Sequence, residues 1–69
     1  MPLVVAPVGK DVRVVKILAD EKTKKHLENL GFVVGGNVMV INTLGGNVIV
    51  NVKEARVAIS EEMARKIMI

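Results

Sequence analysis

The sequence contains no cysteine, tryptophan or tyrosine, and Phe32 is its single aromatic residue. The absence of cysteine excludes disulfides and cysteine-based zinc sites, so the core must hold by packing alone or with a partner subunit. Grooves for proline-rich peptides and platforms for single-stranded nucleic acid are built on aromatic faces, which this chain lacks. A nucleic-acid-binding barrel is therefore disfavoured, although a net charge of +3 permits an acidic partner.

The chain also lacks linkers, repeats and long hydrophobic runs. Its 69 residues predict a single domain over residues 1–69, with little interior. The apolar stretch from Met1 to Gly9 is too short to span a membrane and has no charged leader, so we expect a soluble, cytoplasmic protein without membrane insertion. Because this stretch contains two prolines and a glycine, we predict an extended arm that ends in a turn.

Valine and isoleucine dominate what is present, with 14 and 6 copies, and β-branched side chains favour strands. Gly45 and Gly46 supply the positive φ angles of a tight hairpin. Four or five short strands cannot bury both faces of a flat sheet in so small a chain. The sequence therefore predicts a mainly all-β fold, a small antiparallel β-barrel with one or two helical plugs. The predicted strands span Lys10–Leu18, Asn37–Thr43, Asn47–Val52, Arg56–Ile59 and Ile67–Ile69.

Over Asp20–Leu30 the apolar residues no longer alternate: Leu27 and Leu30 are three apart, which is the spacing of a helix. We therefore predict a short helix here, with Thr23 as a candidate cap. Gly31 follows where a left-handed residue is needed, and glycine takes that conformation without strain. Phe32 then falls where it can pack back onto Leu27.

No catalytic constellation is present. There is no Ser–His–Asp or Cys–His set, and the glycines lack the following lysine and hydroxyl residue of a phosphate-binding loop. Ser60 directly precedes a predicted helical turn and suits a helix cap better than a nucleophile. We therefore expect a protein that is not an enzyme.

His26 is the only histidine and, with Glu28 or with Asp20 or Glu21 nearby, is a weak candidate for a divalent metal site, for iron or zinc. Residues 26 and 28 do not share a helix face, so they make a poor chelate, and a solvated surface histidine is the favoured interpretation. We predict that no cofactor is required.

Apolar residues make up 51% of the chain, and with so little interior some must stay exposed and mark an interface. The candidates are the helix and its exit, with Leu27, Leu30 and Phe32, or residues 68–69, although core positions are favoured for Leu27 and Phe32. Arg56 could contact an anionic partner or pair with a nearby glutamate. Self-association through an unpaired sheet edge is left open, so the chain could form a homo-oligomer.

The order of these signals is itself informative. It comprises Pro7 and Gly9, a strand ending in Ile17, the helix end Leu27, Leu30 and Gly31, then Gly35 or Gly36, Val38 and Val40, the glycine hairpin, Arg56, Val57 and Ile59, and finally Ala64 and Ile67. The run covers nearly the whole chain and resembles the FeoA family of ferrous-iron uptake.

The resemblance implies an SH3-like barrel with one short helix between the first strands and a C-terminal helical turn. It implies an accessory role in which the protein binds the cytosolic region of a FeoB-type transporter and modulates it. A related domain ends many metal-dependent repressors, so the alternative is a domain that binds or senses a divalent transition metal. The resemblance implies no catalytic residue.

Overall fold

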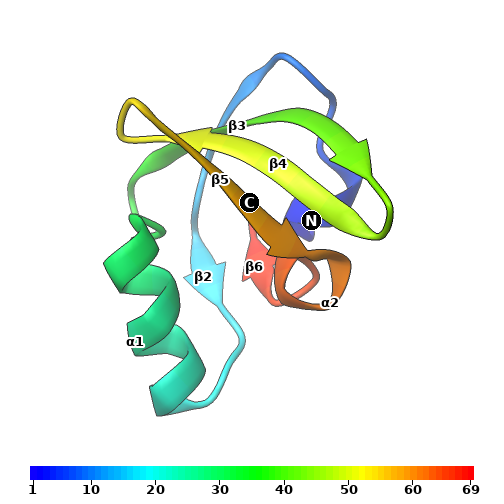
Figure 1. Cartoon of the computed structure of the whole chain (residues 1–69). Helices are drawn as coiled ribbons and strands as arrows, with labels where there is room; N and C mark the ends of the chain where they lie inside the picture. Colours follow the sequence, from blue (N-terminus) through cyan, green and yellow to red (C-terminus); the bar gives the residue numbers. More distant parts are fainter.

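The computed structural model describes residues 1–69 and is mostly β-structure. Figure 1 shows a long curved sheet folded over a shorter one, with one helix set off to the lower left. The predicted antiparallel barrel, with a short helix between its early strands and a helical turn near the C-terminus, is confirmed. Neither α-helix has the length and apolar character that crossing a membrane requires.

The elements form two antiparallel sheets. The four-stranded sheet has the order β1 (Asp11–Arg13), β3 (Asn37–Leu44), β4 (Asn47–Val52) and β5 (Ala55–Ser60). The two-stranded sheet pairs β2 (Lys16–Ile17) with β6 (Ile67–Met68). The helical elements are the 3-10 turn η1 (Leu3–Val5), α1 (Glu21–Leu30) and α2 (Glu61–Ala64).

The core consists of thirteen buried apolar side chains and contains no buried polar or charged residue. Alternate residues of β4 point inward, because successive side chains of a strand lie on opposite faces, and the other strands except β1, the 3-10 turn and both α-helices contribute further members. The thirteen are Leu3, Val14, Ile17, Leu27, Phe32, Val38, Val40, Val48, Val50, Val52, Ile59, Ala64 and Ile67.

The segment predicted as one strand over Lys10–Leu18 is divided between the two sheets. β1 pairs with β3, whereas β2 pairs with β6. The crossing occurs between two adjacent residues: Val14 N–H donates to the carbonyl of Gly36 at 2.9 Å, and Val15 N–H donates to that of Met68 at 2.9 Å. This division closes the barrel, because one short segment forms hydrogen bonds with the first sheet and, one residue later, with the second.

The N-terminal arm is folded rather than extended. Leu3 lies in the 3-10 turn η1 and is fully buried, because the turn places its side chain in the core. Pro2 forms a β-bridge with Met68, and Ile69 N–H donates to the carbonyl of Met1 at 2.6 Å. The two chain ends therefore lie side by side, and β6 has the N-terminal residues on one side and β2 on the other.

The helix α1 begins within one residue of the predicted Asp20–Leu30, but its cap lies three residues before the predicted Thr23. Asp20 is the cap, and its carboxylate accepts the N–H of Thr23 at 2.9 Å. Thr23 is therefore inside the helix. Both residues are good cap formers, and Asp20 takes the position because its backbone is still extended, with ψ of 168°.

The C-terminus of α1 agrees with the prediction. Gly31 has φ of 108°, and its N–H donates to the carbonyl of Glu28 at 2.9 Å. Phe32 N–H donates to the carbonyl of Leu27 at 2.9 Å, which completes the paired bonds of a Schellman motif.

Two hairpins share one turn geometry. Gly45 and Gly46 have φ of 56° and 83°, as predicted for a tight two-residue turn. Lys53 and Glu54 adopt φ of 49° and 65° between β4 and β5 without glycine, although side chains rarely occupy this region. The turn is two residues long, and Ala55 already belongs to β5.

Ser60 caps α2, as predicted, by accepting the N–H of Met63 at 3.2 Å.

Candidate functional site

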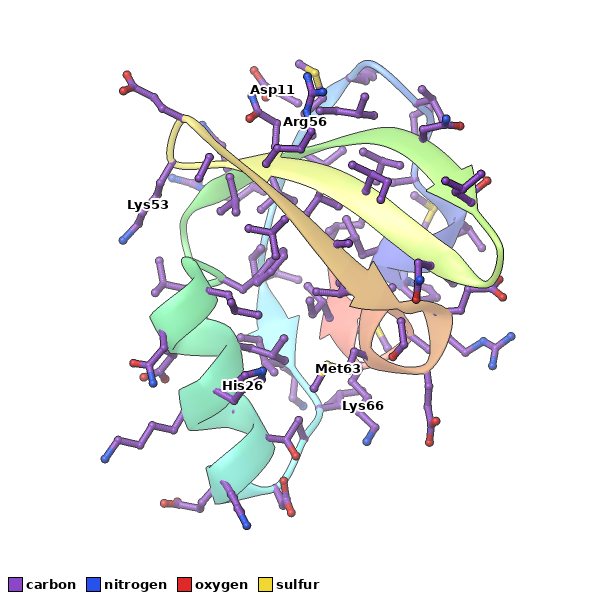
Figure 2. The ribbon with its side chains drawn as sticks, in the orientation of Figure 1. Asp11, His26, Lys53, Arg56, Met63 and Lys66 are labelled. Atoms are coloured by element: carbon purple, nitrogen blue, oxygen red, sulfur yellow. The ribbon has the colours of Figure 1, made fainter.

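The two metal candidates, His26 and Glu28, are both exposed on α1. Figure 2 shows His26 on the side of α1 that faces β2. No three His, Cys, Asp or Glu side chains come together anywhere in the structure, so this pair gains no third ligand. The geometry therefore adds no support for a metal centre at α1.

Asp20 is the one titratable group with a clearly displaced pKa. The side chain of Thr23 and its backbone N–H, which donates to the carboxylate at 2.9 Å, hold the pKa of Asp20 below its ordinary value of 3.8. The positive charge of Lys66 acts in the same direction with a smaller effect. Asp20 therefore stays ionised as a helix cap.

The four partner-binding candidates fall in different environments. Leu27 and Phe32 are completely buried, so their side chains belong to the core and offer no surface to a partner. Leu30 is half-buried against that core. Arg56 is exposed on β5, directly opposite Asn51 of β4, so only Leu30 and Arg56 of the four offer any surface. The structure therefore does not assemble these four into one site.

A different apolar surface appears at the crossing between the two sheets. The exposed fractions of Val15, Leu18 and Val34 are 56%, 46% and 58%. Gly35 N–H donates to the carbonyl of Val14 at 2.7 Å, so the two segments run antiparallel at this point. Val34 and Val15 are the next residues on either side and are therefore neighbours.

The second sheet continues this surface. Val15 is hydrogen-bonded to Met68, and Leu18 N–H donates to the carbonyl of Lys66 at 2.6 Å. Half-buried Met68 and Ile69 therefore adjoin the exposed side chains. We call Val15, Leu18 and Val34 the Val15 patch.

Cationic side chains border the Val15 patch. Lys16 is exposed and lies opposite Met68 in the β2–β6 register. Arg13 reaches the carbonyl of Gly35 with its Nε at 3.5 Å, and Lys66 adjoins Leu18 through the backbone. An apolar centre with a basic border suits a protein surface that is apolar and acidic.

Sequence reasoning missed the Val15 patch because it assumed one regular strand over Lys10–Leu18. A signal was present in the adjacent valine pairs 14–15 and 33–34. Successive side chains on an extended chain point to opposite sides, so each pair must leave one valine away from the core. The structure buries Val14 and exposes Val15, and it leaves Val33 half-buried and Val34 exposed.

Known proteins match this chain over its full length. The FeoA domain model matches residues 1–69. A protein of Methanocaldococcus jannaschii, provisionally named Fe(2+) transport protein A, is 35% identical over 68 residues, which are 99% of this chain and 83% of the relative. The crystal structure of an iron uptake regulatory protein, FeoA, is 28% identical with a TM-score of 0.88, over 97% of this chain and 89% of that one.

Two more distant likenesses concern the fold alone. FeoA of Stenotrophomonas maltophilia in complex with zinc, described as a procaryotic SH3 domain protein, is 24% identical with a TM-score of 0.84 over 99% of this chain and 87% of that one. A manganese-dependent transcriptional repressor is 20% identical with a TM-score of 0.85, over 97% of this chain and 39% of that one. The predicted SH3-like architecture is thereby confirmed.

The family match over residues 1–69 and the 35% identical relative agree with the order of turns and strands in the fold. The chain belongs to the FeoA domain family.

Proposed function

We propose that this protein is a cytoplasmic accessory of ferrous-iron uptake that binds the cytosolic region of a FeoB-type transporter and modulates it. Membership of the FeoA family and a relative named as an Fe(2+) transport protein support the link to iron transport. The observation that carries a docking role is the Val15 patch, where Val15 and Val34 are about half exposed at neighbouring backbone positions and Leu18 is exposed three residues further along the chain.

The size of the patch suits a reversible contact. Fully burying an aliphatic side chain contributes about 1.5–3 kcal/mol, so covering the exposed parts of three contributes roughly 2–5 kcal/mol. Association itself costs several kcal/mol, so the patch needs neighbouring contacts to hold a partner. Arg13, Lys16 and Lys66 can supply them by orienting an acidic partner surface and raising its rate of encounter.

Titration of the fluorescently labelled protein against the isolated cytosolic region of the transporter tests the proposal. We expect a Kd below about 100 μM, which corresponds to more than about 5.5 kcal/mol. Val15→Asp and Val34→Asp should each weaken binding at least about tenfold, because both place an unpaired carboxylate in the buried contact. Val8→Asp is the matched control, because Val8 is 63% exposed in the N-terminal arm, outside the patch.

Two results would contradict the proposal at different levels. No binding at about 100 μM in the nucleotide-free, GDP and GTP-analogue states would remove the transporter as the partner. Binding that Val8→Asp weakens as strongly as Val34→Asp does would remove the Val15 patch as the docking surface.

The metal-sensing alternative has less support. Its support is likeness of fold to a zinc complex of another FeoA protein and to a manganese-dependent repressor. In this chain His26 and Glu28 gain no third ligand from the fold, so no residue set here recommends a particular metal. We therefore favour the docking role.

A further inference from the structure

The four-stranded sheet ends in two edge strands of different character. β1 is three residues long and carries two charged side chains, Asp11 and Arg13. β5 is six residues long and pairs with β4 in unbroken register from Asn47–Ser60 to Val52–Ala55. A long, regular edge strand leaves a row of backbone donors and acceptors open to another chain.

The turn between β4 and β5 determines which groups of β5 face outward. In a two-residue hairpin the residues that flank the turn, here Val52 and Ala55, form a hydrogen-bonded pair, and bonded pairs then alternate along the ladder. Arg56, Ala58 and Ser60 therefore direct their N–H and C=O groups away from β4. Glu61 N–H donates to the carbonyl of Gly46 at 3.0 Å. This bond falls on the next hydrogen-bonded pair of the ladder after Val48–Ile59, as the alternation requires.

β5 lacks the usual devices that protect an edge. It contains no proline, no lysine and no bulge, and Arg56 is its only charged residue. Ala58, at the centre of the outward-facing row, is small and exposed, so another strand can approach it closely.

We propose that β5 pairs with β5 of a second copy of this chain, antiparallel, about a two-fold axis at Ala58. Ala58 then lies opposite Ala58 of the second copy, and Arg56 lies opposite its Ser60. Val57 lies opposite Ile59 of the second copy, so the inward-facing apolar row continues across the junction. The two four-stranded sheets become one continuous sheet.

The register is self-complementary in charge. It keeps the two Arg56 side chains apart and places each beside the start of the other copy's α2, where Glu61 and Glu62 follow Ser60. A register centred on Val57 instead would set Ser60 opposite Glu54 in the turn and would use fewer of the open backbone groups. The Ala58 register is therefore the one that pairs all three outward-facing residues.

Sedimentation velocity on the full chain, from about 10 μM to 1 mM, tests this pairing. Ala58→Pro removes the central outward N–H, and the fold tolerates proline where an edge N–H faces solvent. Ala58→Lys places two lysines face to face at the axis, where like charges repel. Asn42→Lys is the matched control, because Asn42 is exposed on β3, two strands from β5, in the cross-strand row that runs through Ile49 to Ala58.

We expect the wild type and Asn42→Lys to dimerise as concentration rises, and both Ala58 variants to associate at least about tenfold more weakly. An equimolar mixture of Ala58→Lys and Ala58→Glu should restore the dimer, because opposite charges then meet at the axis. Circular dichroism melts verify that each variant is folded.

A wild type that stays monomeric at about 1 mM would overturn the proposal. So would a dimer that Ala58→Lys leaves unchanged, since a different surface would then form it. Neither result bears on transporter binding, because no residue of the Val15 patch belongs to β5.

Discussion

Replacing Gly31 with alanine tests the left-handed backbone geometry with which α1 ends. Gly31 has φ of 108°, and a Cβ placed there would lie 3.2 Å from Cγ2 of Val52 and 3.6 Å from its Cγ1. Left-handed backbone costs a side-chain-bearing residue about 1–2 kcal/mol, and the reduced entropy of the unfolded chain offsets about 0.4–1 kcal/mol of that. Val52 is a buried core residue that cannot retreat freely, so the close contact adds up to about 1 kcal/mol.

We therefore expect Gly31→Ala to lower the free energy of unfolding by about 1–2 kcal/mol, which corresponds to a fall in Tm of about 4–16 °C in a domain of this size. Urea denaturation followed by circular dichroism measures the change. Gly35→Ala is the matched control: Gly35 has φ of 89°, but its added Cβ would meet nothing within 4 Å. An unchanged midpoint for Gly31→Ala, or a larger loss for Gly35→Ala, would refute the reasoning.

Two further predictions concern stability. The pKa of Asp20 is lowered in the folded state, so the stability that this carboxylate contributes is present above the ordinary value of 3.8 and is lost as pH falls through the folded pKa. Measuring Tm as a function of acidic pH should show this loss of stability. The Asp20→Asn variant should show a smaller dependence of Tm on pH in the same range. Phe32→Ala should cost about 3–5 kcal/mol, because Phe32 is completely buried, and the milder Phe32→Leu should keep transporter binding intact if Phe32 serves only the core. Loss of binding by folded Phe32→Leu would contradict that core role.

Local backbone chemistry allowed several features to be predicted from the sequence. Gly31, Gly45 and Gly46 adopt the positive φ angles expected of them, because glycine is the residue that reaches this region without strain. The alternating valines of β4 point inward as a period of two requires. The second hairpin turn, at Lys53–Glu54, has the same geometry without glycine, so the closure of β4 onto β5 imposes it.

The first strand and the helix start depended on contacts that are remote in sequence. Nothing in residues 10–18 indicates that the chain changes sheets between Val14 and Val15, because the bond that marks the change is made to Met68. The same region decides between Asp20 and Thr23 as the cap. The extended segment ends near Leu18, which is bonded to Lys66, so the helix can begin directly after Asp20, three residues before the predicted cap Thr23.

The candidate site was the least predictable part. Composition alone requires that some aliphatic side chains remain exposed, because a chain of 69 residues with 51% apolar content has too little interior for all of them. Which ones remain outside is a property of the closed barrel: Leu27 and Phe32 are completely buried, whereas Val15 and Val34 are about half exposed. Backbone preferences act within a few residues and can be predicted from the sequence. Burial depends on which distant segments cover a side chain, and only the tertiary structure decides that.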